Sequence, residues 1–285
     1  MASQFYPTKP VFFSLTESYK VSESHFTPRL DEYFSERLRH LLGIETATLV
    51  RSDYMDLQPE LSPEARQTLL NWIMKVHFAY QLSPQTLFLS VRLLDRFLSV
   101  EQVQVEEVQL LGMSCLLIAS KMEDTLPLST RDLCLCVGDY CSVNDIIIAE
   151  RNILCVLDYT TTLPSSLSFY EMMIQTLSPA TNTNLYFLAR YFLELLIYDQ
   201  TGALSIRPSL QAAACVSRAV EMTQSNGENW CPSVSFGVTP EEVLVCKEHL
   251  LTVYMTAMTT KNHPVRLKFS SSAYQGIALS LSYTV

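Results

Sequence analysis

The chain has 285 residues, enough for one large domain or two of ordinary size, and 48% of them are hydrophobic. Only 17% are charged, which predicts extensive burial and an apolar contact surface. The net charge of −9 argues against a phosphate-binding surface as the main function, and 7 glycines leave little room for a glycine-rich phosphate loop. We therefore expect no nucleic-acid partner.

Helix signals follow one another along the chain, beginning with the amphipathic stretch LDEYFSERLRHLLG, which we expect to end near Gly43. Later helix starts carry a serine or threonine N-cap followed by proline, by an acid three residues on, or by both: Ser62-Pro63, Ser83-Pro84, Ser129-x-x-Asp132, Ser142-x-x-Asp145 and Thr239-Pro240-Glu241-Glu242. Apolar residues recur at helical spacing between these starts. The pattern predicts an all-α fold.

One helical pattern occurs twice. Residues 105–122 are apolar on nearly every side, as in a buried central helix, and a similar segment returns about 100 residues later. The matching positions are Leu110, Ser114, Cys115, Leu116 and Ala119 with Leu210, Ala214, Cys215, Val216 and Ala219. The repeat predicts two helical domains, over 56–160 and 161–260, with the polar segment 160–166 as their joint. A segment with one helix, 1–55, precedes them, and a tail, 261–285, follows.

The search for catalytic and cofactor motifs is negative. GxGxxG, P-loop and HExxH sequences are absent, and the five histidines are isolated. Cys134, Cys136 and Cys141 are the only candidate metal ligands, but they lack a CxxC pair and a nearby histidine. Ordinary core cysteines explain them better than zinc. We expect a non-catalytic protein without a metal or cofactor.

The chain carries no sign of secretion or membrane insertion. MASQFYPTKP lacks the apolar core of a signal peptide, and no apolar run reaches the roughly 18 residues that span a membrane. The eight cysteines are scattered, which favours free, buried thiols in a reducing compartment. We expect an intracellular protein, in the nucleus, the cytoplasm or both, with no membrane partner.

A few charges fall where helices should be apolar. Arg66 and Asp95 each lie beside leucines, and a buried ion pair between two helices explains them. Glu150 shares a helical face with Val143, Ile147, Leu154 and Leu157, and a lone buried carboxylate is costly. Lys121, at the end of the first central helix, is its candidate partner. Either the two form an internal pair, or both offer hydrogen bonds to a binding partner inside an apolar surface.

With these motifs in place, the chain resembles the cyclin family over about residues 28 to 278. YMDLQPELSPEARQTLLNWIMKV is similar to the opening of a first cyclin box, and LLDRFLS, VQLLGMSCLLIASKMED and ERNILCVLDYTTTLPSSLSFY follow in family order. The resemblance is closest overall to A- and B-type cyclins, with D-type features after the ASK segment. It implies two tandem five-helix cyclin-fold domains with an additional N-terminal helix.

The resemblance also implies a function, which is to bind and activate the catalytic subunit of a cyclin-dependent serine/threonine kinase in cell-cycle control. In the family, the residues matching Lys121 and Glu150 hydrogen-bond to the kinase backbone near its αC helix. The residues matching Met122, Leu154 and Tyr159 pack against that helix, and Glu123 and Asp124 match an acidic pair after the lysine. The resemblance thus favours partner contacts for Lys121 and Glu150, and it assigns Arg66 and Asp95 to the family's buried ion pair.

Many cyclins also dock Arg-x-Leu peptides of substrates or inhibitors on the first helix of the box. The matching residues here are Leu69, Trp72, Lys75, Val108 and Gln109. Ala65 and Thr68 replace two large apolar groups, and Lys75 stands where an acid usually meets the basic residue of the peptide. We expect a weak docking patch or one of altered preference.

One alternative remains at this stage, a cyclin-fold adaptor in transcription like the core of TFIIB, which would bind other proteins or DNA. The negative charge and the lack of an N-terminal zinc ribbon argue against it.

Overall fold

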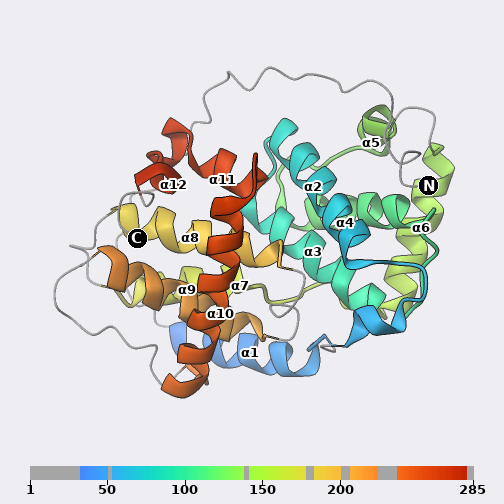
Figure 1. Ribbon diagram of the computed structural model, residues 1–285. Helices are drawn as coiled ribbons and strands as arrows, with labels where there is room; N and C mark the ends of the chain where they lie inside the picture. Colours follow the sequence, from blue (N-terminus) through green and yellow to red (C-terminus); the bar gives the residue numbers. More distant parts are fainter. Residues whose placement is uncertain are drawn as a thin grey trace. The chain divides into compact units, whose positions relative to one another are not determined.

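A computed structural model describes residues 33–50, 53–137, 141–177, 183–199, 206–223 and 236–280 (Figure 1). Within these ranges the chain forms helices and loops and no strand. The described residues divide into two compact units. The first contains Gln58–Thr161, and the second combines residues 33–57 with the chain from Thr162 onward. The all-α class predicted from the sequence is confirmed, and the division falls at the predicted polar joint.

The described residues of the first unit form five helices, α2 (Pro63–Ala79), α3 (Pro84–Leu98), α4 (Val108–Glu123), α5 (Thr130–Val137) and α6 (Val143–Val156). The predicted serine caps begin four of them. Ser62 and Ser83 accept hydrogen bonds from backbone N–H groups in the first turns of α2 and α3. Ser129 and Ser142 form full capping boxes with Asp132 and Asp145 at the starts of α5 and α6. Local sequence therefore fixes where these helices start.

Helix α4 is the centre of the first unit. Its middle is buried continuously from Leu111 to Ser120, and it packs against α2, α3 and α6. A Cβ atom added at Gly112 would lie 2.6 Å from Leu69 Cδ1 and 3.0 Å from Leu69 Cγ, so the leucine side chain would have to shift. The glycine therefore permits the close approach of α2 to α4, and the packing explains why this helix is apolar on nearly every side.

The second unit repeats this plan around α9 and adds helices at both ends. Helix α9 (Pro208–Thr223) packs against α7, α8 and α10, and its predicted small residues are buried. The remaining elements are α1 (Phe34–Ala47), the 3-10 turn η1 (Tyr54–Leu57), α7 (Ser166–Gln175), α8 (Thr183–Ile197), α10 (Pro240–Thr259), α11 (Pro264–Phe269), the 3-10 turn η5 (Ser272–Tyr274) and α12 (Ile277–Ser280). Residues 33–57 and the tail thus belong to the second unit.

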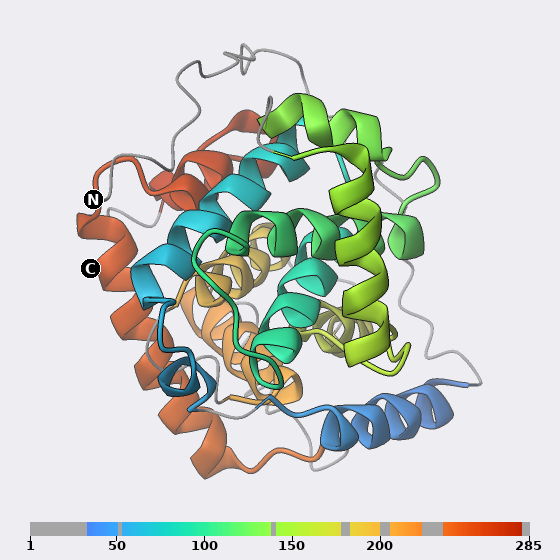
Figure 2. The ribbon, with the colours of Figure 1, turned by 90° about the vertical axis from the view of Figure 1, so that its right-hand side faces the viewer.

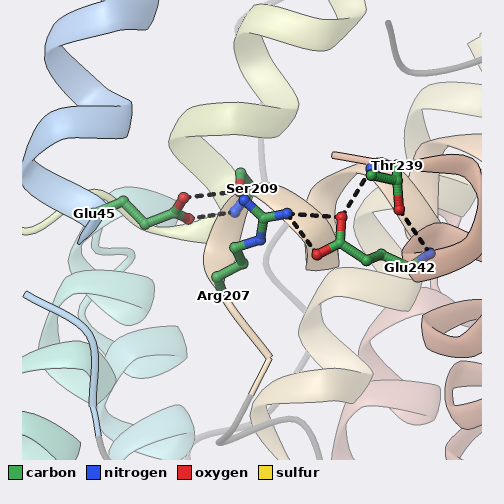
Figure 3. A network of polar contacts seen from close by, with 5 residues as sticks. All are labelled: Glu45, Arg207, Ser209, Thr239 and Glu242. Carbon is green, nitrogen blue, oxygen red and sulfur yellow. Dashed lines mark hydrogen bonds and ion pairs between the residues drawn. The ribbon is translucent and has the colours of Figure 1, made fainter. Parts of the chain in front are cut away.

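Helix α1 runs past the predicted end at Gly43 to Ala47, so the predicted end was wrong. A tertiary contact explains the extra turn. The carboxylate of Glu45 accepts hydrogen bonds from the Ser209 backbone N–H at 2.6 Å and from the Ser209 hydroxyl at 2.8 Å, at the start of α9 (Figure 3). Both residues are buried. The contact satisfies an N–H that the first turn of α9 leaves unpaired, and it holds α1 in place.

The described part of the tail after residue 260 forms short helices packed on α8. Lys268 of α11 donates to both oxygens of the buried Glu194 carboxylate on α8, at 2.8 and 2.7 Å. Burial lowers the pKa of Lys268, and the Glu194 charge opposes that shift. The charged pair and the packing of Phe269 against Tyr274 stabilise helices too short to form alone.

Candidate partner-binding surface of the first unit

Lys121 and Glu150 lie at the point where α6 meets the C-terminal end of α4. The Lys121 Nζ atom is 2.5 Å from Glu150 Oε1, so the internal pair inferred from spacing exists. The side chains are still reachable, with 45% of Lys121 and 17% of Glu150 exposed. The contact uses one N–H of the ammonium and one oxygen of the carboxylate. The other N–H groups of Lys121 and Glu150 Oε2 are left for further hydrogen bonds.

The apolar seam that contains Glu150 faces outward, not into the core of its own unit. The core contacts of α6 are made by Ile146, Ile153 and the C-cap Leu157. On the seam, Val143 and Ile147 are 36% and 40% exposed. Of the apolar residues on this face, only Leu157 is buried in the core. Helical spacing identifies an apolar face but does not say whether the core or a partner covers it.

Further apolar side chains surround the polar pair. Met122 at the end of α4 is 50% exposed, Tyr159 just past α6 is 66% exposed, and Leu154 is half-buried. We call these five residues, Lys121, Met122, Glu150, Leu154 and Tyr159, the α4–α6 surface. In Figure 2 the yellow-green helix α6 crosses the green helix α4. Protein interfaces combine apolar contacts with a small number of hydrogen bonds, and this surface offers groups for both.

The turn after α6 holds Tyr159 in an uncommon backbone conformation. Asp158 and Tyr159 have φ values of 48° and 55°, in the left-handed region that favours glycine. A 2.8 Å hydrogen bond from the Tyr159 N–H to the Leu154 carbonyl closes the turn. A bulky residue in this region is strained, and such strain is often found at functional sites. The turn directs the chain back past α4, where Thr161 Oγ1 lies 3.9 Å from Met122 Sδ.

The two acids after Lys121 differ in their surroundings. Asp124 accepts hydrogen bonds from the Ser83 backbone N–H at 2.7 Å and from the Thr86 hydroxyl at 2.6 Å, at the start of α3. Its carboxylate is therefore engaged within the unit. Glu123 is exposed, and partial burial together with the Asp124 charge raises its pKa. Of the pair, Glu123 is the one whose carboxylate faces solvent.

The residues predicted to form a docking patch lie on α2 and α4. Leu69 and Val108 are buried, Trp72 and Gln109 are half-buried, and Lys75 is exposed. Beneath them, Arg66 and Asp95 form a bidentate pair with both N–O distances at 2.9 Å. The pair joins α2 to α3 and is buried.

No group of three or more metal-ligating side chains comes together anywhere in the part of the chain that the structure describes. Cys134, Cys136 and Cys141 are half-buried and Cys155 is exposed, so among the described cysteines the expectation of buried thiols holds for Cys115, Cys215 and Cys246. Cys231 lies outside the described residues. No described helix is long and apolar enough to cross a membrane.

Two family models match the chain one after the other. The cyclin N-terminal domain matches residues 36–162, and the cyclin C-terminal domain matches residues 164–283. The chain belongs to the cyclin family. As a cyclin, it has the two tandem domains that the duplicated central helix predicted, and the boundary between the matches coincides with the polar joint.

Individual relatives are A- and B-type cyclins, as the motifs predicted. The chain is 32% identical over 232 residues to Cyclin-B1-1 of Oryza sativa subsp. japonica, covering 80% of this chain and 51% of the relative. It is 27% identical over 255 residues to the G2/mitotic-specific cyclin-A of Hydra viridissima, covering 89% of this chain and 60% of that protein. The chain therefore spans about half the length of the plant relative.

The fold is also similar to a solved structure. The X-ray structure of a viral cyclin from herpesvirus saimiri matches with a TM-score of 0.59 at 21% identity. The match covers 76% of this chain and 97% of the viral protein. At this identity the similarity establishes the two-domain cyclin architecture.

Proposed function

We propose that this cyclin is a non-catalytic regulatory subunit that binds and activates a cyclin-dependent protein kinase through the α4–α6 surface. The observation that carries the proposal is the polar pair of Lys121 and Glu150 within an exposed apolar seam. Such a seam costs free energy in water unless a partner covers it. The pair supplies one donor and one acceptor in its middle, which suits the free backbone groups at a helix end of a partner.

The proposed mechanism is differential binding. The cyclin contacts the αC helix of the kinase only in the inward position, in which the kinase lysine–glutamate pair forms and the activation loop rearranges. Binding then shifts the kinase population towards that state by as much as the two states differ in affinity. All chemistry stays in the kinase. We propose the nucleus, the cytoplasm or both as the place of action.

The direct test is to mix the protein with candidate cyclin-dependent kinases and to measure both complex formation and phosphorylation of a peptide substrate. We expect at least one kinase to form a stable complex and to gain activity. An adaptor of the TFIIB kind would form no such complex and would instead bind DNA. Turnover of substrate without added kinase would contradict the regulatory role.

Replacing Tyr159 by glycine distinguishes what the tyrosine ring contributes to kinase binding from what its strained backbone conformation costs in stability. Glycine adopts the left-handed conformation without strain, so we expect the denaturation midpoint of Tyr159→Gly to stay the same or rise. Loss of a buried tyrosine from an interface should weaken kinase binding by about thirtyfold. Calorimetric titration with the kinase measures the second effect, and urea denaturation measures the first.

Asp158→Gly is the matched control, since it relieves the same kind of strain in the same turn. It should raise the denaturation midpoint and leave kinase affinity unchanged. Equal loss of binding in both variants would show that the shape of the turn matters and that the tyrosine ring does not.

We further propose that Lys75 weakens docking of Arg-x-Leu peptides on α2, because its positive charge repels the basic residue of such a peptide. Lys75→Glu should tighten binding of a labelled Arg-x-Leu peptide by about fivefold to tenfold in fluorescence anisotropy at low salt. Lys261→Glu, an exposed lysine after α10, is the control for net charge and should change little. Tight binding by the unmodified protein that Trp72→Ala abolishes would contradict the proposal.

A further inference from the structure

Helix α10 carries apolar side chains on two opposite faces. One face packs in the core of the second unit through Val243, Cys246, Leu250, Tyr254 and Ala257. The other faces solvent, and its large apolar residues are 54%, 66%, 44% and 43% exposed, at Leu244, Val245, Leu251 and Met255. Single exposed leucines are common, but Leu244, Leu251 and Met255 recur along one side of the helix and form a stripe in which Glu248 lies between the two leucines.

The stripe has the spacing of a coiled-coil seam. Positions 241, 248 and 255 fall on one heptad position and 244, 251 and 258 on the other, with alternating steps of three and four residues. Leucine or methionine occupies both positions except at Glu241 and Glu248. We call this set, from Glu241 to Met258, the α10 seam. A charged residue at a core position of a coiled coil lowers affinity but selects the register and the partner.

The seam is held rigid without any partner. Thr239 and Glu242 form a capping box at the start of α10, and Arg207 donates to both oxygens of the Glu242 carboxylate at 2.9 Å (Figure 3). Lys247, on the flank of the helix, pairs with Glu221 of α9. In contrast, the carboxylates of Glu241 and Glu248 meet no cation or donor among the described residues. A preformed helix that presents apolar groups and unpaired acids is organised to bind.

We propose that the α10 seam binds an amphipathic α-helix of another protein that carries lysine or arginine opposite Glu241 and Glu248. The apolar positions would pack as in a two-stranded coiled coil, and the basic residues would pair with the two carboxylates. A second copy of this chain fits poorly. Parallel copies would set Glu248 against Glu248, and antiparallel copies would press the carboxylate against leucine.

The test uses the full chain and synthetic helical probes of three heptads. One labelled peptide has leucine at one core position and lysine at the other, a second has glutamate in place of lysine, and a third is a scrambled form of the first. Fluorescence anisotropy should show the lysine peptide binding at least about tenfold more tightly than either of the others. Glu248→Lys should reverse the preference between the lysine and the glutamate peptide.

Leu251→Asp should weaken binding of the lysine peptide by at least about tenfold, since it replaces an apolar contact of the α10 seam with a third acid. Leu267→Asp, at a 57% exposed leucine on α11, is the matched control and should bind as the unmodified protein does. Circular dichroism checks that both variants fold, as their exposure leads us to expect.

Three results would overturn the proposal. The scrambled peptide could bind as tightly as the lysine peptide, which would mean attraction by net charge alone. Leu251→Asp could leave binding unchanged, which would place the peptide elsewhere. Sedimentation equilibrium could show a dimer of the unmodified protein that Leu251→Asp dissociates, which would assign the seam to a second copy. Kinase activation does not enter any of these readouts, so the outcome is independent of the proposed function.

Discussion

A double variant carrying Lys121→Ala and Glu150→Ala is expected to lose at least about a hundredfold in kinase affinity and most of its stimulation of kinase activity. The estimate assumes one hydrogen bond from each charged group to the kinase backbone, each contributing about 1.5 to 3 kcal/mol. Both changes also remove polar groups from the centre of an apolar contact, where interfaces concentrate their energy. Calorimetric titration with the kinase and a peptide phosphorylation assay measure the two losses.

The same double variant should fold almost as stably as the unmodified protein. The Lys121–Glu150 pair is partly exposed, and exposed ion pairs contribute about 0 to 1 kcal/mol to the free energy of unfolding. This contrast decides whether the pair acts within the unit or on a partner. If the pair served only to join α4 to α6, urea denaturation would show the effect and kinase binding would not.

Arg218→Ala combined with Glu221→Ala is the control for removing surface charges; because Glu221 also pairs with Lys247, this variant removes two ion pairs outside the α4–α6 surface. These two residues are 3.3 Å apart on the surface of α9, with exposures of 35% and 45%. Their loss should leave kinase binding unchanged. An equal effect of the two double variants would show that removing surface charge, and not this particular site, weakens the complex.

Local sequence predicted helix starts well, because a cap is made of neighbours in the chain. The boxes at Ser142 and Thr239 close as their spacing predicted, and Ser62 and Ser83 cap the helices that begin at the following prolines. The helix end at Gly43 failed for the opposite reason. What continues α1 is the contact between Glu45 and Ser209, which are distant in sequence.

The residues of the candidate site could be predicted from the sequence, but whether their face of α6 points to the core or to solvent could not. Spacing placed Glu150 on an apolar face and paired it with Lys121, and both inferences match the structure. Whether Val143 and Ile147 faced the core depended on which side of α6 packs against α4, and a spacing pattern is the same for either choice.

Some structural residues left no signal in the sequence at all. Gln58 is buried and donates to the carbonyls of Leu98 and Glu101, at 2.6 and 2.7 Å, while its oxygen accepts from the Val103 N–H at 3.0 Å. It thereby closes the loop between α3 and α4. These contacts join positions forty or more residues apart, and no local sequence pattern marks a glutamine that will make them.

Asp95→Ala should cost about 3 to 5 kcal/mol in the free energy of unfolding, the largest stability effect we expect from a single substitution in the first unit. The change leaves the Arg66 guanidinium buried between α2 and α3 without the carboxylate that binds it at 2.9 Å through two parallel hydrogen bonds. Arg66→Ala has the opposite effect on charge, because it leaves the buried Asp95 carboxylate without the guanidinium that binds it. Urea denaturation followed by circular dichroism measures both, and kinase binding should fall only where the protein begins to unfold.

Replacing both partners at once tests whether the cost comes from the broken pair or from lost packing. Arg66→Met with Asp95→Leu keeps side-chain volume and removes both charges, so we expect it to recover most of the loss and to come within about 1 to 2 kcal/mol of the unmodified protein. A double variant as unstable as either single one would instead mean that the pair provides net stabilisation that apolar packing cannot replace. In that case the α2–α3 contact would depend on the geometry of the two hydrogen bonds, since removing both charges would not have restored the free energy of unfolding.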